Sequence, residues 1–174
     1  MSFMTQLKDE GGSPWLGDVR VRPYGITDGP RLRRMSGRLS THSLYSRFFA
    51  GTPHIPDTYV RHLDRLDHWD REALVALVDD DIVGIAEYVR APADPHRAEL
   101  AVLVTDPWQR HGVGRLLVGC LALTAARRGI TAFDAGVLPG NRPALSAIRT
   151  AWPLVRPWHE DGSAHFRLPL GAPA

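Results

Sequence analysis

One segment constrains the fold of this chain more than any other: an apolar stretch, a polar loop with two glycines and an amphipathic stretch lie consecutively in residues 102–124. After the loop, apolar residues recur at the spacing of one helix face, at Val113, Leu116, Leu117, Cys120, Leu121 and Thr124. A helix that begins in a glycine loop presents unpaired backbone N–H groups and the positive end of its dipole. The segment therefore predicts a strand, a phosphate- or pyrophosphate-binding loop and a helix.

The loop differs from two other phosphate-binding loops. The dinucleotide fingerprint needs a third glycine where Leu117 stands, and a Walker loop needs a Gly-Lys-Ser/Thr ending that the sequence lacks. Gly112 and Gly114 would let the backbone approach an anion, although two glycines can also serve only a turn. Charge and hydrogen-bond donors would come from Arg110, His111 and Arg115.

Composition narrows the class of protein. With 174 residues, 44% of them hydrophobic, the chain can bury a core of its own, and we expect a flexible leader over 1–17 and one domain over 18–170. The net charge of +2 gives no case for nucleic acid, and we expect neither a membrane-spanning run nor a secretory signal. A single cysteine, Cys120, excludes an intrachain disulfide and fits a reducing cytoplasm. Its place on the apolar helix stripe favours a core residue over a catalytic thiol.

Periodicity and turn residues predict an α/β (α+β) fold with a mixed sheet of about six to seven strands and helices on both faces. Strands are expected at 18–24, 74–78, 82–89, 98–105, 130–138, 154–158 and 164–170. Helices are expected at 28–39, at 43–49, after a cap at Asp57, up to Arg128 and from a cap at Asn141 to about 151. A tight polar turn is expected over 79–81.

The Gln-x-x-Gly-x-Gly pattern between strand and helix resembles the acetyl-coenzyme A motif of the GNAT N-acetyltransferases, and the element order matches that family over roughly 18–170. The resemblance implies the GNAT fold and acetyl-CoA as co-substrate. It implies that a gap beside the strand before the loop receives the pantetheine arm, with backbone contacts from Leu103 and Val104. The pyrophosphate would be held by Gln109, Arg110, His111, Gly112, Val113, Gly114 and Arg115. Asn141 would lie near coenzyme A, cap its helix, or do both.

Four further segments are similar to the GNAT domains of bacterial protein lysine acetyltransferases: Leu39–Phe49, Arg71–Val78, Val83–Arg90 and Ala98–Val102. Those domains modify lysines on acyl-CoA synthetases and other enzymes, so the resemblance implies a protein lysine as acceptor. A small-molecule amine is the alternative acceptor. Outside the enzyme class, the chain could be a catalytically silent acyl-CoA-binding sensor. Either a monomer or a homodimer is compatible with this interpretation.

Acyl transfer to an amine requires the neutral amine. At pH 7 a lysine is about 3.4 pH units below its reference pKa, so deprotonation costs roughly 4.6 kcal/mol. A carboxylate near the thioester can take this proton directly or through water. Glu99, which matches the glutamate assigned as base in the lysine acetyltransferase branch, is the first candidate, and Glu87 on the preceding strand is the second. The alternative for either is a solvent-facing charge.

Two other positions limit the chemistry. Many GNAT enzymes carry a tyrosine acid on the helix after the asparagine, but the matching position is Ile148, which we expect to be a core residue. His62 and His68 are six residues apart, which does not place them on one helical face, so we expect a polar surface there and no metal site. For a protein acceptor we expect an open groove lined by residues 43–49, 52–59 and 90–97.

Overall fold

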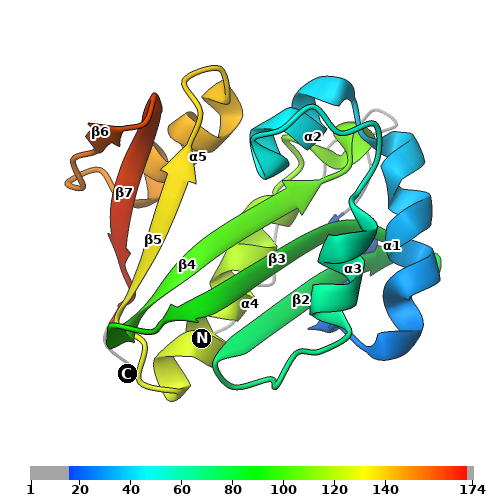
Figure 1. Cartoon of the computed structure of the whole chain (residues 1–174), viewed down its shortest axis with the longest axis horizontal. Helices are drawn as coiled ribbons and strands as arrows, with labels where there is room; N and C mark the ends of the chain where they lie inside the picture. The colour runs from blue at the N-terminus through cyan, green and yellow to red at the C-terminus, as the bar shows by residue number, and fades with distance from the viewer. Residues whose placement is uncertain (1–15, 172–174) are drawn as a thin grey trace.

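The computed structural model describes residues 16–171, which form a seven-stranded sheet in the order β1-β2-β3-β4-β5-β7-β6 (Figure 1). Its strands are β1 (Arg20–Pro23), β2 (Arg71–Val78), β3 (Asp81–Ala91), β4 (Asp94–Val104), β5 (Ala132–Val137), β6 (Trp158–Glu160) and β7 (Ser163–Pro169). Only β4 and β5 pair in parallel among these neighbours of the described region; the other pairs are antiparallel. The mixed sheet predicted from the sequence is confirmed.

Helices cover both faces of the sheet (Figure 1). They are α1 (Gly29–Met35), α2 (Thr41–Phe48) and α3 (Asp57–Leu63) on one face, and α4 (Val113–Arg127) and α5 (Arg142–Ala151) on the other. Of the leader expected over 1–17, residues 1–15 lie outside the described residues, and a 3-10 turn begins at Leu16.

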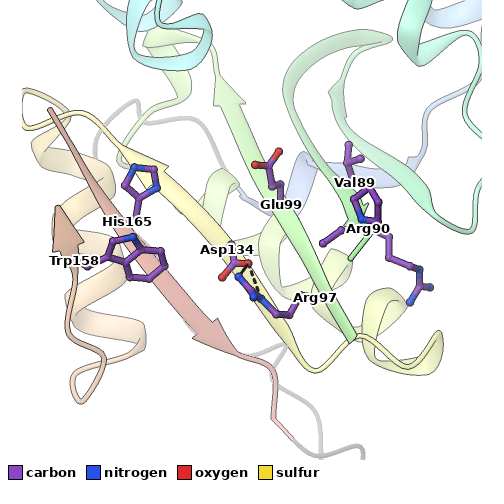
Figure 2. Close-up of a pocket in the computed structure, with 9 residues that line it drawn as sticks. Val89, Arg90, Arg97, Glu99, Asp134, Trp158 and His165 are labelled. Carbon is purple, nitrogen blue, oxygen red and sulfur yellow. Dashed lines mark hydrogen bonds and ion pairs between the residues drawn. The ribbon is translucent and has the colours of Figure 1, made fainter. Parts of the chain in front are cut away.

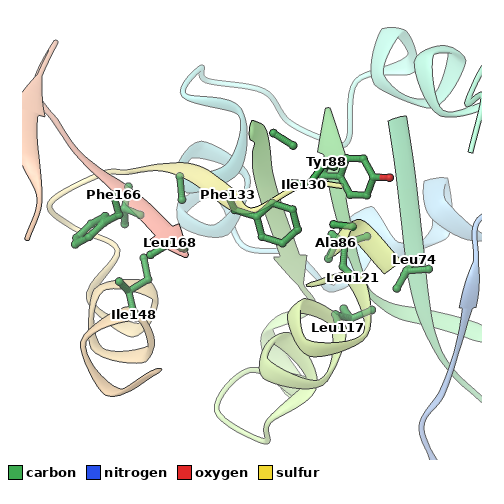
Figure 3. Packing of buried hydrophobic residues seen from close by; sticks show 14 of the residues in the cluster. Leu74, Ala86, Tyr88, Leu117, Leu121, Ile130, Phe133, Ile148, Phe166 and Leu168 are labelled. Carbon is green, nitrogen blue, oxygen red and sulfur yellow. The ribbon is translucent and has the colours of Figure 1, made fainter. Parts of the chain in front are cut away.

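The core is divided in two because strand side chains alternate between the faces of the sheet. On β3, Ile85 belongs to the cluster under α1–α3, whereas Ala86 and Tyr88 belong to the cluster under α4 and α5. Figure 3 shows Leu117 and Leu121 of α4 packed against this second side of the sheet. Both leucines are fully buried, which confirms the apolar stripe read from the sequence.

Several boundaries differ from the sequence expectations. The helix expected at 28–39 is α1 with a 3-10 turn at each end, and Pro56 rather than Asp57 caps α3. Asp57 instead forms an ion pair with Arg33, at 3.1 Å between Nε and Oδ1. The strand expected at 154–158 begins only at Trp158, because prolines at 153 and 157 cannot donate ladder hydrogen bonds.

Strands β4 and β5 separate along their length. Their pairing covers Arg97–Glu99 against Ala132–Asp134, after which the strands diverge (Figure 1). Against β3, β4 keeps one register from Ala98 to Val104, and the irregularity in that pairing falls at the hairpin, between Arg90 and Ala91. The edge of β4 after Glu99 therefore has no β5 partner within residues 16–171.

Candidate active site

The glycine loop leads directly into the N-terminus of α4. Arg110 and Gly112 both have positive φ, at 62° and 86°, and Gly112 is the N-cap of the helix. The Gly112 carbonyl accepts the N–H of Leu116 at 2.9 Å. The N–H groups before Leu116 have no acceptor within the helix, so they are available to an anion beside the loop.

Gln109 turns inward and fastens the loop to its neighbours. Its Nε2 donates to the carbonyl of Val104 and to Ser43 Oγ, both at 3.0 Å. Ser43 Oγ in turn donates to Asp106 Oδ1 at 2.8 Å, and the backbone N–H of Ser40 donates to the same oxygen at 3.1 Å. Burial opposes the charge of Asp106, but these hydrogen bonds outweigh it and lower its pKa. Gln109 thus positions the loop, and its side chain is already engaged by protein.

Successive residues of β4 direct their backbone N–H and C=O groups alternately toward β3 and toward the open edge. The N–H of Thr105 donates to Val83 at 2.9 Å, so the hydrogen-bonded pairs with β3 fall on the odd-numbered residues of β4, including Leu103. The polar groups of Val102 and Val104 point to the other edge, where Gln109 occupies the Val104 carbonyl. Leu103, expected to contact the pantetheine, therefore turns its polar backbone groups to β3, whereas Val102, which the sequence did not single out, turns them to the open edge.

Other loop residues surround the start of α4. Arg110 and Arg115 are exposed, and His111 is half-buried. A Cβ on Gly114 would lie 3.7 Å from Val104 Cγ2, so the first turn of α4 packs against the open part of β4. The predicted anion loop and the predicted gap therefore lie side by side.

Asn141 and Ile148 lie on α5. The Asn141 side-chain oxygen accepts the N–H of Ala144 at 3.3 Å, which makes it the N-cap of the helix. Ile148 is 8% exposed and packs in the same cluster as Phe166 and Leu168 (Figure 3). It is a core residue, as expected, and offers no proton to a leaving group.

Glu99 stands where β4 and β5 begin to separate. Its register partners are Val89 on β3 and Asp134 on β5, and its side chain is exposed. It faces a pocket of about 410 Å³ (Figure 2). The pocket is lined by Val89, Arg90, Ala91, Pro92, Arg97, Glu99, Asp134, Trp158 and His165.

The walls of this pocket coincide only in part with the groove expected from the sequence. Residues 89–92 and Arg97 line one side, but residues 43–49 and 52–59 contribute no lining residue. The opposite wall is Trp158 and His165, whose rings stack with centroids 5.6 Å apart. Sequence reasoning missed this wall, because the pairing of β5 with β7 that brings it to Glu99 joins segments about 30 residues apart.

Glu87 shares a face of the sheet with Glu99 but has different surroundings. It is 9% exposed and forms an ion pair with Arg47 of α2. The Arg47 guanidinium lies over the ring of Tyr59, 4.9 Å from its centroid. Burial raises the pKa of Glu87, while Arg47 and Tyr59 act to lower it. A carboxylate already held by a guanidinium is a poor acceptor for a substrate proton, so Glu87 is better explained as the anchor of α2.

Comparison with known proteins identifies the family. The model of the acetyltransferase (GNAT) family matches residues 39–150. The crystal structure of the GNAT domain of S. lividans PAT is 32% identical, with a TM-score of 0.81 over 87% of this chain and 90% of that one. The chain belongs to the GNAT acetyltransferase family. It is an N-acetyltransferase, as the sequence resemblance implied.

Two more distant GNAT-fold structures share the fold alone. The protein yncA from Salmonella typhimurium, solved with its cofactor acetyl-CoA, is 16% identical, with a TM-score of 0.70 over 90% of this chain and 96% of that chain. A cAMP-binding acyltransferase from Mycobacterium smegmatis is 22% identical, with a TM-score of 0.61 over 87% of this chain. This GNAT chain spans 43% of the length of the M. smegmatis protein.

The described residues offer neither a metal site nor a membrane-spanning helix. Among residues 16–171, no three or more His, Cys, Asp or Glu side chains are grouped so as to hold a metal ion. His68 instead lies 2.8 Å from Glu72, between Nδ1 and Oε1. None of the helices in the described part of the chain is long and apolar enough to cross a membrane.

Proposed function

We propose that this GNAT protein transfers the acetyl group of acetyl-CoA directly to the ε-amine of a protein lysine, with Glu99 as the general base. The observation that carries the proposal is the place of Glu99: an exposed carboxylate in an open pocket, at the point where β4 and β5 separate. Among residues 16–171 it forms no ion pair, whereas Glu87 is held by Arg47.

Acetyl-CoA would bind along the glycine loop and the open edge of β4. The N–H groups at the start of α4 would hold the pyrophosphate, with Gly112 allowing the close approach of the backbone. The pantetheine would pair with β4 as an added strand would, through the backbone of Val102. Surrounding charge would come from the predicted loop residues Arg110, His111 and Arg115.

The chemistry needs one proton acceptor and one nucleophile. Glu99 would take a proton from the lysine ammonium, directly or through water, and the neutral amine would attack the thioester carbonyl carbon. The new C–N bond forms as the C–S bond breaks, and coenzyme A leaves as a thiolate that solvent protonates. Because Ile148 cannot donate a proton, we assign no side chain as acid.

A protein acceptor is supported by two observations. The pocket at Glu99 is open, with polar and aromatic walls from two separate hairpins, which suits a large partner. The 32% identity to the GNAT domain of S. lividans PAT points the same way. The competing functions are acetylation of a small-molecule amine and non-catalytic sensing of acyl-CoA. An acyl-CoA synthetase as the acceptor and a cytoplasmic location stay predictions.

Labelled acetyl-CoA and a lysate of the source organism test the proposal. Mass spectrometry should find acetylated lysines in proteins after incubation with the wild type and not with Glu99→Gln, although both should bind acetyl-CoA equally. A free amine acetylated faster than any protein would instead show a small-molecule enzyme. Binding of acetyl-CoA without thiol release on any amine would show a sensor.

A further inference from the structure

Beside Glu99 lies a cluster of three charges, Arg97, Asp134 and Arg167, here called the Asp134 triad. Arg97 Nε donates to Asp134 Oδ2 at 2.9 Å, and Arg167 Nε donates to Oδ1 at 3.1 Å. Figure 2 shows Arg97 turned toward Asp134, next to Glu99. The single carboxylate of Asp134 thus forms ion pairs with two guanidiniums from two different strands.

The strand register also places the two arginines near Glu99. Arg97 precedes Glu99 by two residues on β4, so the two side chains leave the same face of the strand. Asp134 is the direct register partner of Glu99 on β5, and Arg167 is the partner of Asp134 on β7. If the Asp134 carboxylate were absent, the neighbouring carboxylate for Arg97 and Arg167 in this row of the sheet would be that of Glu99.

We propose that Asp134 is a positioning residue that keeps Glu99 available as a base by holding Arg97 and Arg167 away from it. The inference rests on the proposed function. A guanidinium beside a carboxylate favours its charged form and so makes it a weaker base. Asp134, which has both of its oxygens engaged, prevents that pairing.

Other charged groups near Glu99 are already engaged or lie further along the sheet. Arg90 is bonded to Asp70, at 2.7 Å between Nε and Oδ1, and to the carbonyls of Pro95 and Arg128. His165 stacks on Trp158. On β2 and β3, this face also carries the Glu87–Arg47 ion pair and Arg71, which is separated from Glu99 by Val89. Glu160 on β6 and Arg20 and Arg22 on β1 lie further along the sheet. The Asp134 triad is therefore the group whose charge should control Glu99.

Nuclear magnetic resonance tests the inference without any acceptor. In protein labelled with ¹³C at glutamate carboxyls, the Glu99 signal is assigned by its loss in Glu99→Gln. Asp134→Asn should move the titration midpoint of this signal to lower pH, because the two released guanidiniums favour the charged carboxylate. The rate of acetyl transfer to n-butylamine, a mimic of the lysine side chain, should fall roughly 3–10-fold at neutral pH, and the acid limb of its pH profile should move in the same direction.

The matched control is Asp134→Asn combined with Arg97→Gln. This pair of changes restores the net charge of the triad and removes the nearer guanidinium, so the midpoint and the rate should return toward the wild-type values. Should Asp134→Asn fail to fold, Arg97→Gln alone keeps the Asp134–Arg167 bond and should move the midpoint to higher pH.

An unmoved midpoint in folded Asp134→Asn, or a double variant that behaves like Asp134→Asn, would overturn the inference. Failure of the proposed function looks different. In that case the wild type would acetylate no amine, while the titration of Glu99 would still respond to Asp134 and Arg97 as described.

Discussion

Replacing Gly112 by alanine tests how strictly the loop geometry is tied to acetyl-CoA binding. Gly112 has φ of +86°, a conformation that costs an L residue about 1–2 kcal/mol. A Cβ there would lie 2.7 Å from Leu16 Cδ1, but this is the end of a side chain that is 38% exposed and can move aside. The backbone strain should therefore dominate, and the midpoint of thermal unfolding should fall by roughly 2–8 °C.

The same substitution should weaken acetyl-CoA binding by more than it destabilises the fold. Relief of the strain rotates the N-cap and turns the first N–H groups of α4 away from the anion. Each hydrogen bond lost to a charged group is worth roughly 1.5–3 kcal/mol, so affinity should fall on the order of 10–100-fold. Isothermal calorimetry measures the affinity, and scanning calorimetry measures the stability.

Gly114→Ala is the matched control, one residue into the same helix. A Cβ at Gly114 meets Val104 and Val102 only at 3.7 and 3.9 Å, which is ordinary contact, and alanine favours a helix interior by about 0.5–1 kcal/mol. Its stability and affinity should be close to those of the wild type. Equal affinities in the two variants would refute the argument that positive φ at Gly112 aims the helix N-terminus.

Three further predictions concern the site. Glu99→Gln should lower turnover about 10²–10⁴-fold with unchanged acetyl-CoA affinity, and Glu87→Gln should lower it less; the reverse order in steady-state kinetics would make Glu87 the base. Gly114→Glu should abolish acetyl-CoA binding by calorimetry while circular dichroism stays native, since a carboxylate would lie at the anion site; retained affinity contradicts the loop assignment. Ile148→Ala should cost roughly 2–5 kcal/mol in urea unfolding without slowing thiol release, and selective loss of release would argue against a core role.

Local signals made the cofactor side of the site predictable. The apolar stripe of α4, the glycine that starts it and the asparagine that caps α5 each depend on residues within one or two helical turns. The same is true of the β2–β3 turn, where Asp79 and Asp80 both adopt positive φ. Such features can be read from neighbouring residues alone.

Non-local pairing explains what the sequence did not reveal. Which β4 residues turn their backbone to the open edge depends on the register with β3, so Leu103 and Val102 could not be distinguished beforehand. The wall formed by Trp158 and His165 depends on β7 pairing with β5, which no local pattern specifies. Local sequence within the strand expected at 164–170 likewise does not specify which pocket His165 lines.

The open edge of β4 also has a consequence for how the protein behaves in solution. Unpaired strand edges are templates on which other chains can add, and proteins commonly protect them. Here the exposed stretch is short, and Gln109 covers its far end by taking the Val104 carbonyl. A bound pantetheine would shield the remainder. Protein stripped of acetyl-CoA should therefore aggregate sooner on storage than the loaded form, because the bound co-substrate would also hinder self-association.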